Sequence, residues 1–145
     1  MAAAWLNSST GEVQPALPPW QDNSKGEKMF SSYVCPGDSV MFEHGKFTFN
    51  VRLEYDDFST PHELDCYSES DIARWKNDEW FYGGLVVSVS YNGFHLSDNI
   101  ASLWGLECNF GNDNSFLMEY AGELVEEARE EAEELLEATR IRLAA

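Results

Sequence analysis

Few side chains in this sequence are of the types that act as acids, bases or nucleophiles in enzymes. The chain has three histidines and three cysteines: His44, His62, His95, Cys35, Cys66 and Cys108. His62 and Cys66 lie four residues apart, and with Asp57 or Asp65 they suggest a Cys-His-Asp site. The neighbouring carboxylates oppose formation of a thiolate, so a reactive cysteine is not expected there. A small enzyme that uses Cys66 and His62 is therefore only an alternative hypothesis.

The sequence also lacks motifs that are typical of metal-binding, cofactor-binding or nucleic-acid-binding sites. It contains no CxxC and no HExxH pair, which are typical of metal sites. Gly83-Gly84 alone is not a glycine-rich phosphate loop, and no basic patch with interleaved aromatic residues is present. We therefore expect a protein that is not an enzyme, holds no metal or cofactor and does not bind nucleic acid directly.

The composition is strongly acidic. The 145 residues include 26 Asp and Glu but only 9 Lys and Arg, which gives a formal net charge of −17. Such a field repels nucleic acid and anionic membranes, whereas it attracts the basic grooves of nucleic-acid-binding proteins. Because 43% of the residues are hydrophobic and 14% aromatic, the chain should fold around a core rather than form a disordered acidic tail. The alternative is that the acidity serves solubility alone.

The expected location is the cytoplasm, and the host cytoplasm if the chain is encoded by a phage. No apolar run approaches the roughly 18 residues needed to span a bilayer. The first residues lack the basic region and the long apolar core of a signal peptide. The odd number of cysteines, at irregular spacing, also argues against a secreted disulfide framework.

Most of the net charge lies in two segments. From Asp113 onward the chain carries ten acidic and three basic residues, and residues 54–79 carry nine acidic and two basic residues. Each segment therefore has a net charge of −7, and together they hold 14 of the 17 net charges. At helical spacing, the C-terminal glutamates form two rows. The first row contains Glu119, Glu123, Glu126, Glu130, Glu133 and Glu137, and the second row contains Glu127, Glu131 and Glu134.

These rows indicate a partner-binding surface. A helix that needs only solubility gains from interleaved lysines, but here only Arg129 interrupts the glutamates. Carboxylates about 5–6 Å apart come close to the spacing of phosphates along one DNA strand. We expect the partner to contact Glu119, Glu123, Glu126, Glu127, Glu130, Glu133, Glu134 and Glu137. A second candidate surface comprises Asp56, Asp57, Asp65, Glu69 and Asp71.

Hydrophobic periodicity predicts the elements that position these residues. Residues 46–55 and 80–91 alternate in the manner of half-buried strands, and Asn92-Gly93 is typical of a type I′ hairpin turn. A return strand should begin at residues 94–96, break at 97–101 and resume at 102–110. A short helix should run from Ser68 or Ser70 to about Asn77, with Ile72 and Trp75 facing the core. Gly83-Gly84 indicates a bulge or a close backbone approach.

The C-terminal segment changes to helical periodicity from Ser115 to about Leu143. Its expected core stripe is Leu117, Ala121, Leu124, Ala128, Ala132, Leu135 and Thr139. The predicted fold class is α+β: an antiparallel sheet of about four strands, with a short helix and a long acidic C-terminal helix packed on one face. Residues 29–145 form the single domain. Residues 1–28 read as a flexible leader in which Trp5 and Trp20 dock on the domain or on a partner.

One stretch of the sequence resembles a group of known proteins. The residues are Trp80-Phe81-Tyr82-Gly83-Gly84-Leu85-Val86-Val87-Ser88-Val89, then Gly93, then Ser102-Leu103-Trp104-Gly105-Leu106-Glu107. This pattern looks like that of small acidic proteins of phages and mobile elements, in which a valine-rich strand precedes an "SLWG-hydrophobic-E" strand and a C-terminal helix. By charge and size alone, the chain is also similar to anti-restriction and anti-CRISPR proteins that imitate DNA.

Together these observations predict a non-enzymatic inhibitor or binding protein. Its acidic surface would occupy the basic nucleic-acid channel of a host defence complex, such as a CRISPR or restriction effector. The alternative is an accessory protein that binds a basic partner without imitating nucleic acid.

Overall fold

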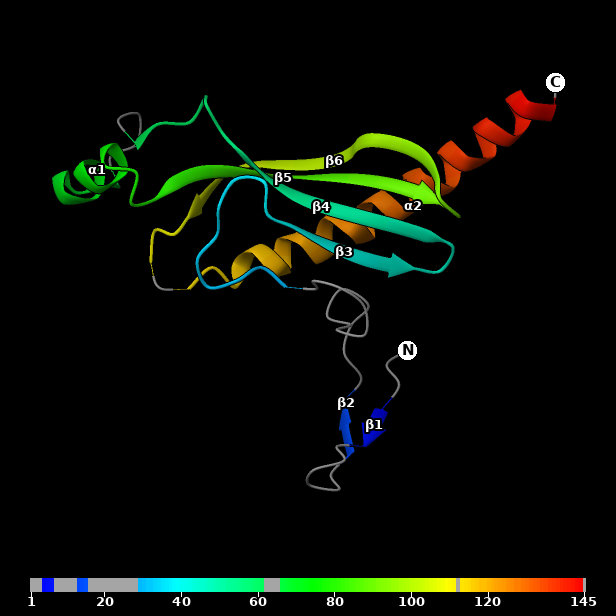
Figure 1. Ribbon diagram of the computed structural model, residues 1–145, viewed down its shortest axis with the longest axis horizontal. Helices are drawn as coiled ribbons and strands as arrows, with labels where there is room; N and C mark the ends of the chain where they lie inside the picture. Colours follow the sequence, from blue (N-terminus) through cyan, green and yellow to red (C-terminus); the bar gives the residue numbers. More distant parts are fainter. Residues whose placement is uncertain (1–3, 7–12, 16–28, 62–65, 112, 145) are drawn as a thin grey trace.

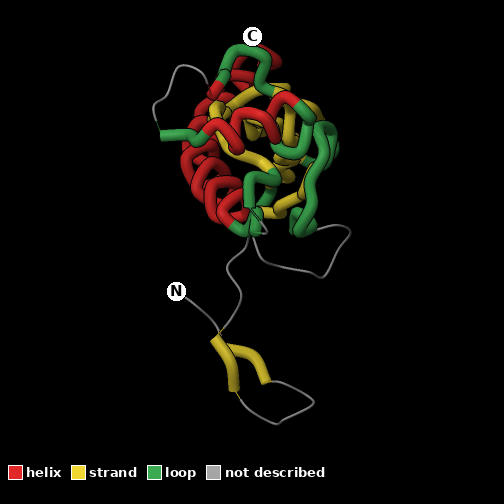
Figure 2. The backbone as a smooth tube through the Cα atoms, turned by 90° about the vertical axis from the view of Figure 1, so that its left-hand side faces the viewer, coloured by secondary structure: helices red, strands yellow, loops and turns green. Residues whose placement is uncertain are grey.

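The computed structural model describes residues 4–6, 13–15, 29–61, 66–111 and 113–144. Its elements are β1 (Ala4–Leu6), β2 (Val13–Pro15), β3 (Ser39–His44), β4 (Phe47–Tyr55), α1 (Glu69–Lys76), β5 (Phe81–Tyr91), β6 (Phe94–Cys108) and α2 (Phe116–Ala144). Strands β3 to β6 form one antiparallel sheet in the order β3-β4-β5-β6 (Figure 1). Helix α2 lies along one face of this sheet, so that helix and sheet form two layers (Figure 2). The α+β fold predicted from the sequence is confirmed.

Tight turns and the strict alternation of buried and partly buried side chains explain why these segments pair as a sheet. Along β4 the side chains alternate between buried and partly buried positions up to Tyr55, as the sequence predicted. The turn between β5 and β6 has positive φ at Asn92 (47°) and Gly93 (80°), as a type I′ turn requires. At the β3–β4 turn, Gly45 takes the positive φ (62°) and His44 pairs with Phe47. These short connections fix the register of the β3–β4 and β5–β6 pairs.

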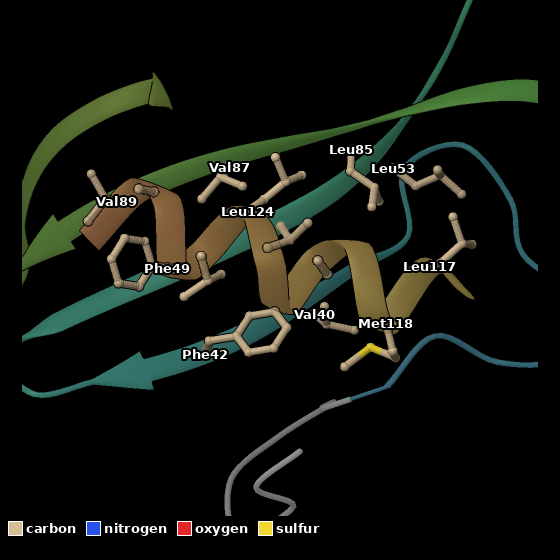
Figure 3. Packing of buried hydrophobic residues seen from close by; sticks show 14 of the residues in the cluster. Val40, Phe42, Phe49, Leu53, Leu85, Val87, Val89, Leu117, Met118 and Leu124 are labelled. Carbon is tan, nitrogen blue, oxygen red and sulfur yellow. The ribbon is translucent and has the colours of Figure 1, made fainter. Parts of the chain in front are cut away.

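The core lies between the sheet and α2 (Figure 3). Phe49 of β4 and Leu124 of α2 both face into it and are buried. The buried stripe of the helix is wider than the sequence predicted, and consists of Leu117, Met118, Ala121, Gly122, Leu124, Val125, Ala128, Ala132 and Leu136. Leu135, an expected core residue, is only partly buried. Leu136 takes its place because it continues the buried line through Val125 and Ala132 at helical spacing.

Two strand predictions need correction. β6 is continuous, and the expected break at residues 97–101 is an irregularity in its pairing with β5. β3 was not expected, because Met41 is 50% exposed between the buried Val40 and Phe42 and so blurs the alternation of apolar and polar residues. The sheet has the predicted number of strands, but β3 replaces the second half of the expected broken strand.

Helix α1 begins where the sequence placed it but does not contribute to the core. Ser68 caps it, and Ser68 and Asp71 form a reciprocal capping box. Ile72 and Trp75, which were expected to face the core, are only partly buried, and no residue of α1 is fully buried. The helix lies at the end of the sheet, away from α2 (Figure 1). Trp80, which follows it, is buried instead and donates its indole N–H to the Asp71 carbonyl at 2.8 Å.

Part of the N-terminal segment is paired. β1 and β2 form an antiparallel two-stranded ladder in which Trp5 lies opposite Gln14. This pairing was not expected, because the segment has no periodic pattern. Trp20 lies outside the described residues, as does most of the leader. Among the helices that the structure describes, none is long and apolar enough to cross a membrane.

Candidate partner-binding surface

A buried asparagine pair fixes the start of α2. Asn114 accepts a hydrogen bond from the backbone N–H of Asn109 (2.9 Å) and donates to the side-chain oxygen of Asn109 (2.9 Å) and to the carbonyl of Ser32 (2.7 Å). Asn109 in turn pairs with both backbone groups of Val34. The end of β6, the first turn of α2 and residues 32–34 are thereby joined, because each buried polar group has a partner. The acidic helix is therefore held in a fixed position.

Asp113 caps the helix from outside this network. Its carboxylate accepts hydrogen bonds from the backbone N–H of Ser115 (2.8 Å) and from the Ser115 hydroxyl (3.1 Å). These bonds lower the pKa of the Asp113 carboxyl below its usual value. A carboxylate at this end also faces the positive end of the helix dipole. Asp113 thus stabilises the turn that leads into α2.

Every glutamate of the two rows is exposed. The nine side chains between Glu119 and Glu137 all lie on the side of α2 that faces away from the sheet or along its borders. Over the 18 residue steps from first to last, the helix rises by about 27 Å, which gives about one carboxylate per 3 Å. The phosphates of one DNA strand follow each other at about 3.4 Å along the helix axis. The linear charge density of α2 is therefore close to that of a single nucleic-acid strand.

The β3–β4 turn neutralises part of the first row. The His44 ring lies 3.3 Å from the Glu126 carboxylate and 3.2 Å from the Arg129 guanidinium, and Lys46 forms an ion pair with Glu133 at 3.0 Å. These contacts join positions about 85 residues apart and therefore leave no signal in the periodicity of the sequence. They fasten the helix to the sheet and place the Lys46 ammonium group along one border of the acidic face.

Six glutamates of the two rows have no ion pair among the residues that the structure describes: Glu119, Glu123, Glu127, Glu130, Glu131 and Glu134. Glu137, at the end of the first row, lies 4.0 Å from Arg140 on the next turn. The Glu137 side chain nevertheless remains 65% exposed. The least neutralised part of the face therefore runs along the middle of α2 and toward β6.

The five residues of the second candidate surface do not act together. Asp57 and Glu69 are exposed. Asp71 belongs to the capping box of α1 and lies 3.7 Å from Arg74. Asp65 is outside the described residues. Asp56, which was expected to be exposed, is buried, so this surface is not the continuous acidic patch that the sequence suggested.

Asp56 is instead a structural carboxylate. It accepts hydrogen bonds from the backbone N–H groups of Phe58 (2.9 Å), Ser59 (3.2 Å) and Gly105 (3.0 Å), and from the Ser59 hydroxyl (2.8 Å). Burial by itself would raise the pKa of the Asp56 carboxyl, but these hydrogen bonds outweigh it, and the pKa lies below its usual value. Asp56 thereby ties the loop after β4 to β6 and is unavailable to a partner.

The alternative Cys66–His62 site cannot be assembled from the described residues. Cys66 is an exposed free thiol, whereas His62 and Asp65 lie outside the described residues. The neighbouring Tyr67 hydroxyl donates a hydrogen bond to Glu107. Burial and this carboxylate raise the pKa of Tyr67. In the part of the chain that the structure describes, no group of three or more His, Cys, Asp or Glu side chains is placed to hold a metal ion.

Three residues of the stretch that resembles phage proteins, Gly84, Trp104 and Gly105, have roles in packing and backbone geometry. The Trp104 indole lies directly over Gly84, and Gly105 adopts a positive φ of 77° while its N–H reaches Asp56. Comparison of the chain with protein-family models, with curated proteins and with solved structures finds no match. The acidic face of α2 is therefore interpreted from its geometry and charge.

Proposed function

We propose that this chain is a non-enzymatic inhibitor, encoded by a phage or mobile element, that binds the basic nucleic-acid channel of a host defence complex such as a CRISPR or restriction effector. One observation carries this proposal: nine glutamates are exposed along one rigid helix, at a density close to that of the phosphates of a nucleic-acid strand. Like charges at this spacing cost stability, so a surface that serves only solubility has no need of them.

The anchoring of α2 supports the same proposal. A charge array that competes with nucleic acid gains from being held in place, because no ordering cost is then paid on binding. The Asn109–Asn114 network fixes the start of the helix, and Lys46 and His44 fasten its middle to the sheet. Attraction to a basic channel would be long-ranged and would speed association at low salt.

One observation favours the alternative of an accessory protein that binds a basic partner without imitating nucleic acid. The β3–β4 turn neutralises Glu133 through Lys46 and occupies Glu126 through His44, so the remaining free carboxylates spread over both rows rather than along one line. A basic protein surface of any shape could contact them. Competition with nucleic acid separates the two functions, because only a mimic shares its binding site with DNA or RNA.

The test uses a panel of purified CRISPR and restriction effectors, each bound to fluorescently labelled target DNA. The full chain should displace the DNA from at least one of them, which fluorescence anisotropy measures, and displacement should weaken steeply as salt rises because charges are screened over about 8–10 Å at physiological ionic strength. The key variant replaces Glu119, Glu123, Glu130 and Glu137 with glutamine, which preserves shape and helix propensity.

A matched variant removes four charges outside both candidate surfaces, by replacing the exposed Glu43 and Glu79 with glutamine and the exposed Asp78 and Asp98 with asparagine. The helix variant should lose displacement and the matched variant should keep it. Equal loss in both would mean that net charge alone is responsible. Binding of an effector without any competition from DNA would favour the accessory protein, and no binding to any effector would contradict the proposal.

A further inference from the structure

A groove runs between α2 and the middle of β6, beside the second row of glutamates. It consists of two adjoining hollows of about 370 Å³ and about 400 Å³, which share Ile100 and Glu131 in their walls. On the helix side, Leu124, Ala128 and Leu135 line the hollows between the glutamates of the second row. The first row borders a hollow lined by α2 alone, whereas the hollows beside the second row reach from the helix to β6.

The β6 side of the groove offers backbone groups. Val87 of β5 pairs with Ala101, but Val89 pairs with Ser97, so residues 98–100 lie opposite Ser88 alone. This bulge widens the strand where Ile100 enters the groove. Within the described residues β6 pairs only with β5, so its outer edge is a free sheet edge. Such an edge can accept an added strand.

The opposite wall is a line of carboxylates. Glu127, Glu131 and Glu134 are exposed and have no ion pair in the described part of the chain. From Leu124 to Leu135 the helix rises by about 16 Å, the length of about five residues of extended chain. Alternate side chains of such a chain point to the same side about 7 Å apart, close to the rise of about 6 Å between Glu127 and Glu131.

We propose that this groove binds an extended basic segment of the partner protein, with its backbone along the free edge of β6 and with lysines or arginines at alternate positions facing Glu127, Glu131 and Glu134. The inference rests on the proposed function for the identity of the partner, since basic arms are common in nucleic-acid-binding proteins. It adds the location and the conformation of the contact: an arm laid along β6, rather than a channel closed around the first row.

The same bulge and charges would also serve to keep the free edge from pairing with other chains. Direct binding of a peptide to this edge separates the two roles.

The experiment uses a defined probe, a capped nine-residue peptide that alternates lysine with valine, and measures its affinity for the full chain by calorimetry near physiological salt. Under these conditions charges more than about 8–10 Å from the peptide are screened. Amide shifts in nuclear magnetic resonance spectra should concentrate at residues 97–102 and 124–135.

Two variants with equal charge locate the site. Replacement of Glu127, Glu131 and Glu134 with glutamine should weaken peptide binding by about tenfold or more, and replacement of Glu119, Glu123 and Glu130 by less than about threefold. If the two variants weaken peptide binding equally, the peptide does not bind in the groove and the proposal is overturned. A peptide that alternates lysine with proline carries the same charge but lacks the backbone N–H groups of the valines, and should bind more weakly. If it binds equally well, strand addition is wrong.

The peptide experiment can fail independently of the proposed function. If the chain displaces DNA from an effector but the second-row variant does so as well as the parent, the proposal that the groove is the binding site is overturned. The proposal that the chain is an inhibitor then still holds. If the peptide binds the groove as expected but no effector releases DNA, the groove is a binding site for basic segments and the proposed inhibitor function is wrong. A chain that is dimeric without peptide, with amide shifts at 97–102 on dilution, would assign the groove to a second copy and overturn the proposal.

Discussion

The indole of Trp104 lies so close to the backbone of Gly84 that a Cβ atom at position 84 would be 2.1 Å from Trp104 Cε3. Gly84 is in β5 and Trp104 is in β6, so the tryptophan lies flat across the neighbouring strand on the face opposite α2. The sequence suggested a close backbone approach at Gly83-Gly84, and this contact explains it. Gly84 and Trp104 thus form one packing unit, whereas Gly83 lies against Cys108 and Leu53.

The first prediction concerns this contact. Gly84→Ala should destabilise the fold by about 1–3 kcal/mol, because the added methyl group must displace the indole ring. Urea unfolding followed by circular dichroism measures the change. Gly111→Ala is a matched control, since a Cβ there meets nothing within 4 Å and needs no unusual φ. Its effect should stay within about 0.5 kcal/mol. Equal effects at both positions would show that Trp104 does not hold its place over Gly84.

The second prediction concerns Asp56. Asp56→Asn should lower the free energy of unfolding by about 1–3 kcal/mol at neutral pH, because one of its two oxygens becomes an N–H₂ group facing other donors. Asp57→Asn, at the adjacent exposed position, should have little effect. If both variants are as stable as the parent, the Asp56 hydrogen bonds do not contribute to the fold.

The pH dependence of this difference has a definite sign. Because the pKa of Asp56 is lower in the folded than in the unfolded chain, its contribution is fully present above the unfolded pKa of about 3.9 and is lost as the pH falls through the folded value. The stability gap between the parent and Asp56→Asn should therefore be constant near neutrality and shrink below about pH 4. A gap that widens on acidification would contradict this assignment.

Local pattern was enough to predict β4, β5 and the extent of α2, because each has a strict period and a clear turn or cap. It was not enough for Asp56, whose burial depends on the backbone N–H of Gly105, 49 residues away. Likewise, the pairing of Glu133 with Lys46 follows only from where the sheet places the β3–β4 turn. Periodicity describes one element at a time, and contacts between distant elements carry no signal in it.

The third prediction concerns the thiols. Cys35 and Cys66 are exposed, whereas Cys108 is fully buried, and burial raises the pKa of its thiol to about 12. A thiol reagent should therefore modify two cysteines of the folded chain and the third only after denaturation. Colorimetric titration in buffer and in denaturant measures this. In a Cys108→Ala variant the denaturant should expose no additional thiol. Rapid modification of Cys108 in the folded chain would mean that its site opens readily.

The last prediction separates glutamates that stabilise α2 from those that strain it. Glu123 and Glu130 have like-charged neighbours three or four positions away and no ion pair in the described residues, and unlike Glu119 they lie outside the first turn, where the helix dipole stabilises a carboxylate. Their replacement with glutamine should raise the stability by about 1 kcal/mol at low salt, since each relieved pair contributes a few tenths. Glu126 and Glu133 contact His44 and Lys46, so their replacement should give no such gain. Thermal unfolding at low and high salt measures both, and the gain should fade as salt screens the repulsion. If the first variant is no more stable than the second, repulsion along the helix is negligible. The acidic face then carries no cost, and the argument that it is retained for binding loses its physical basis.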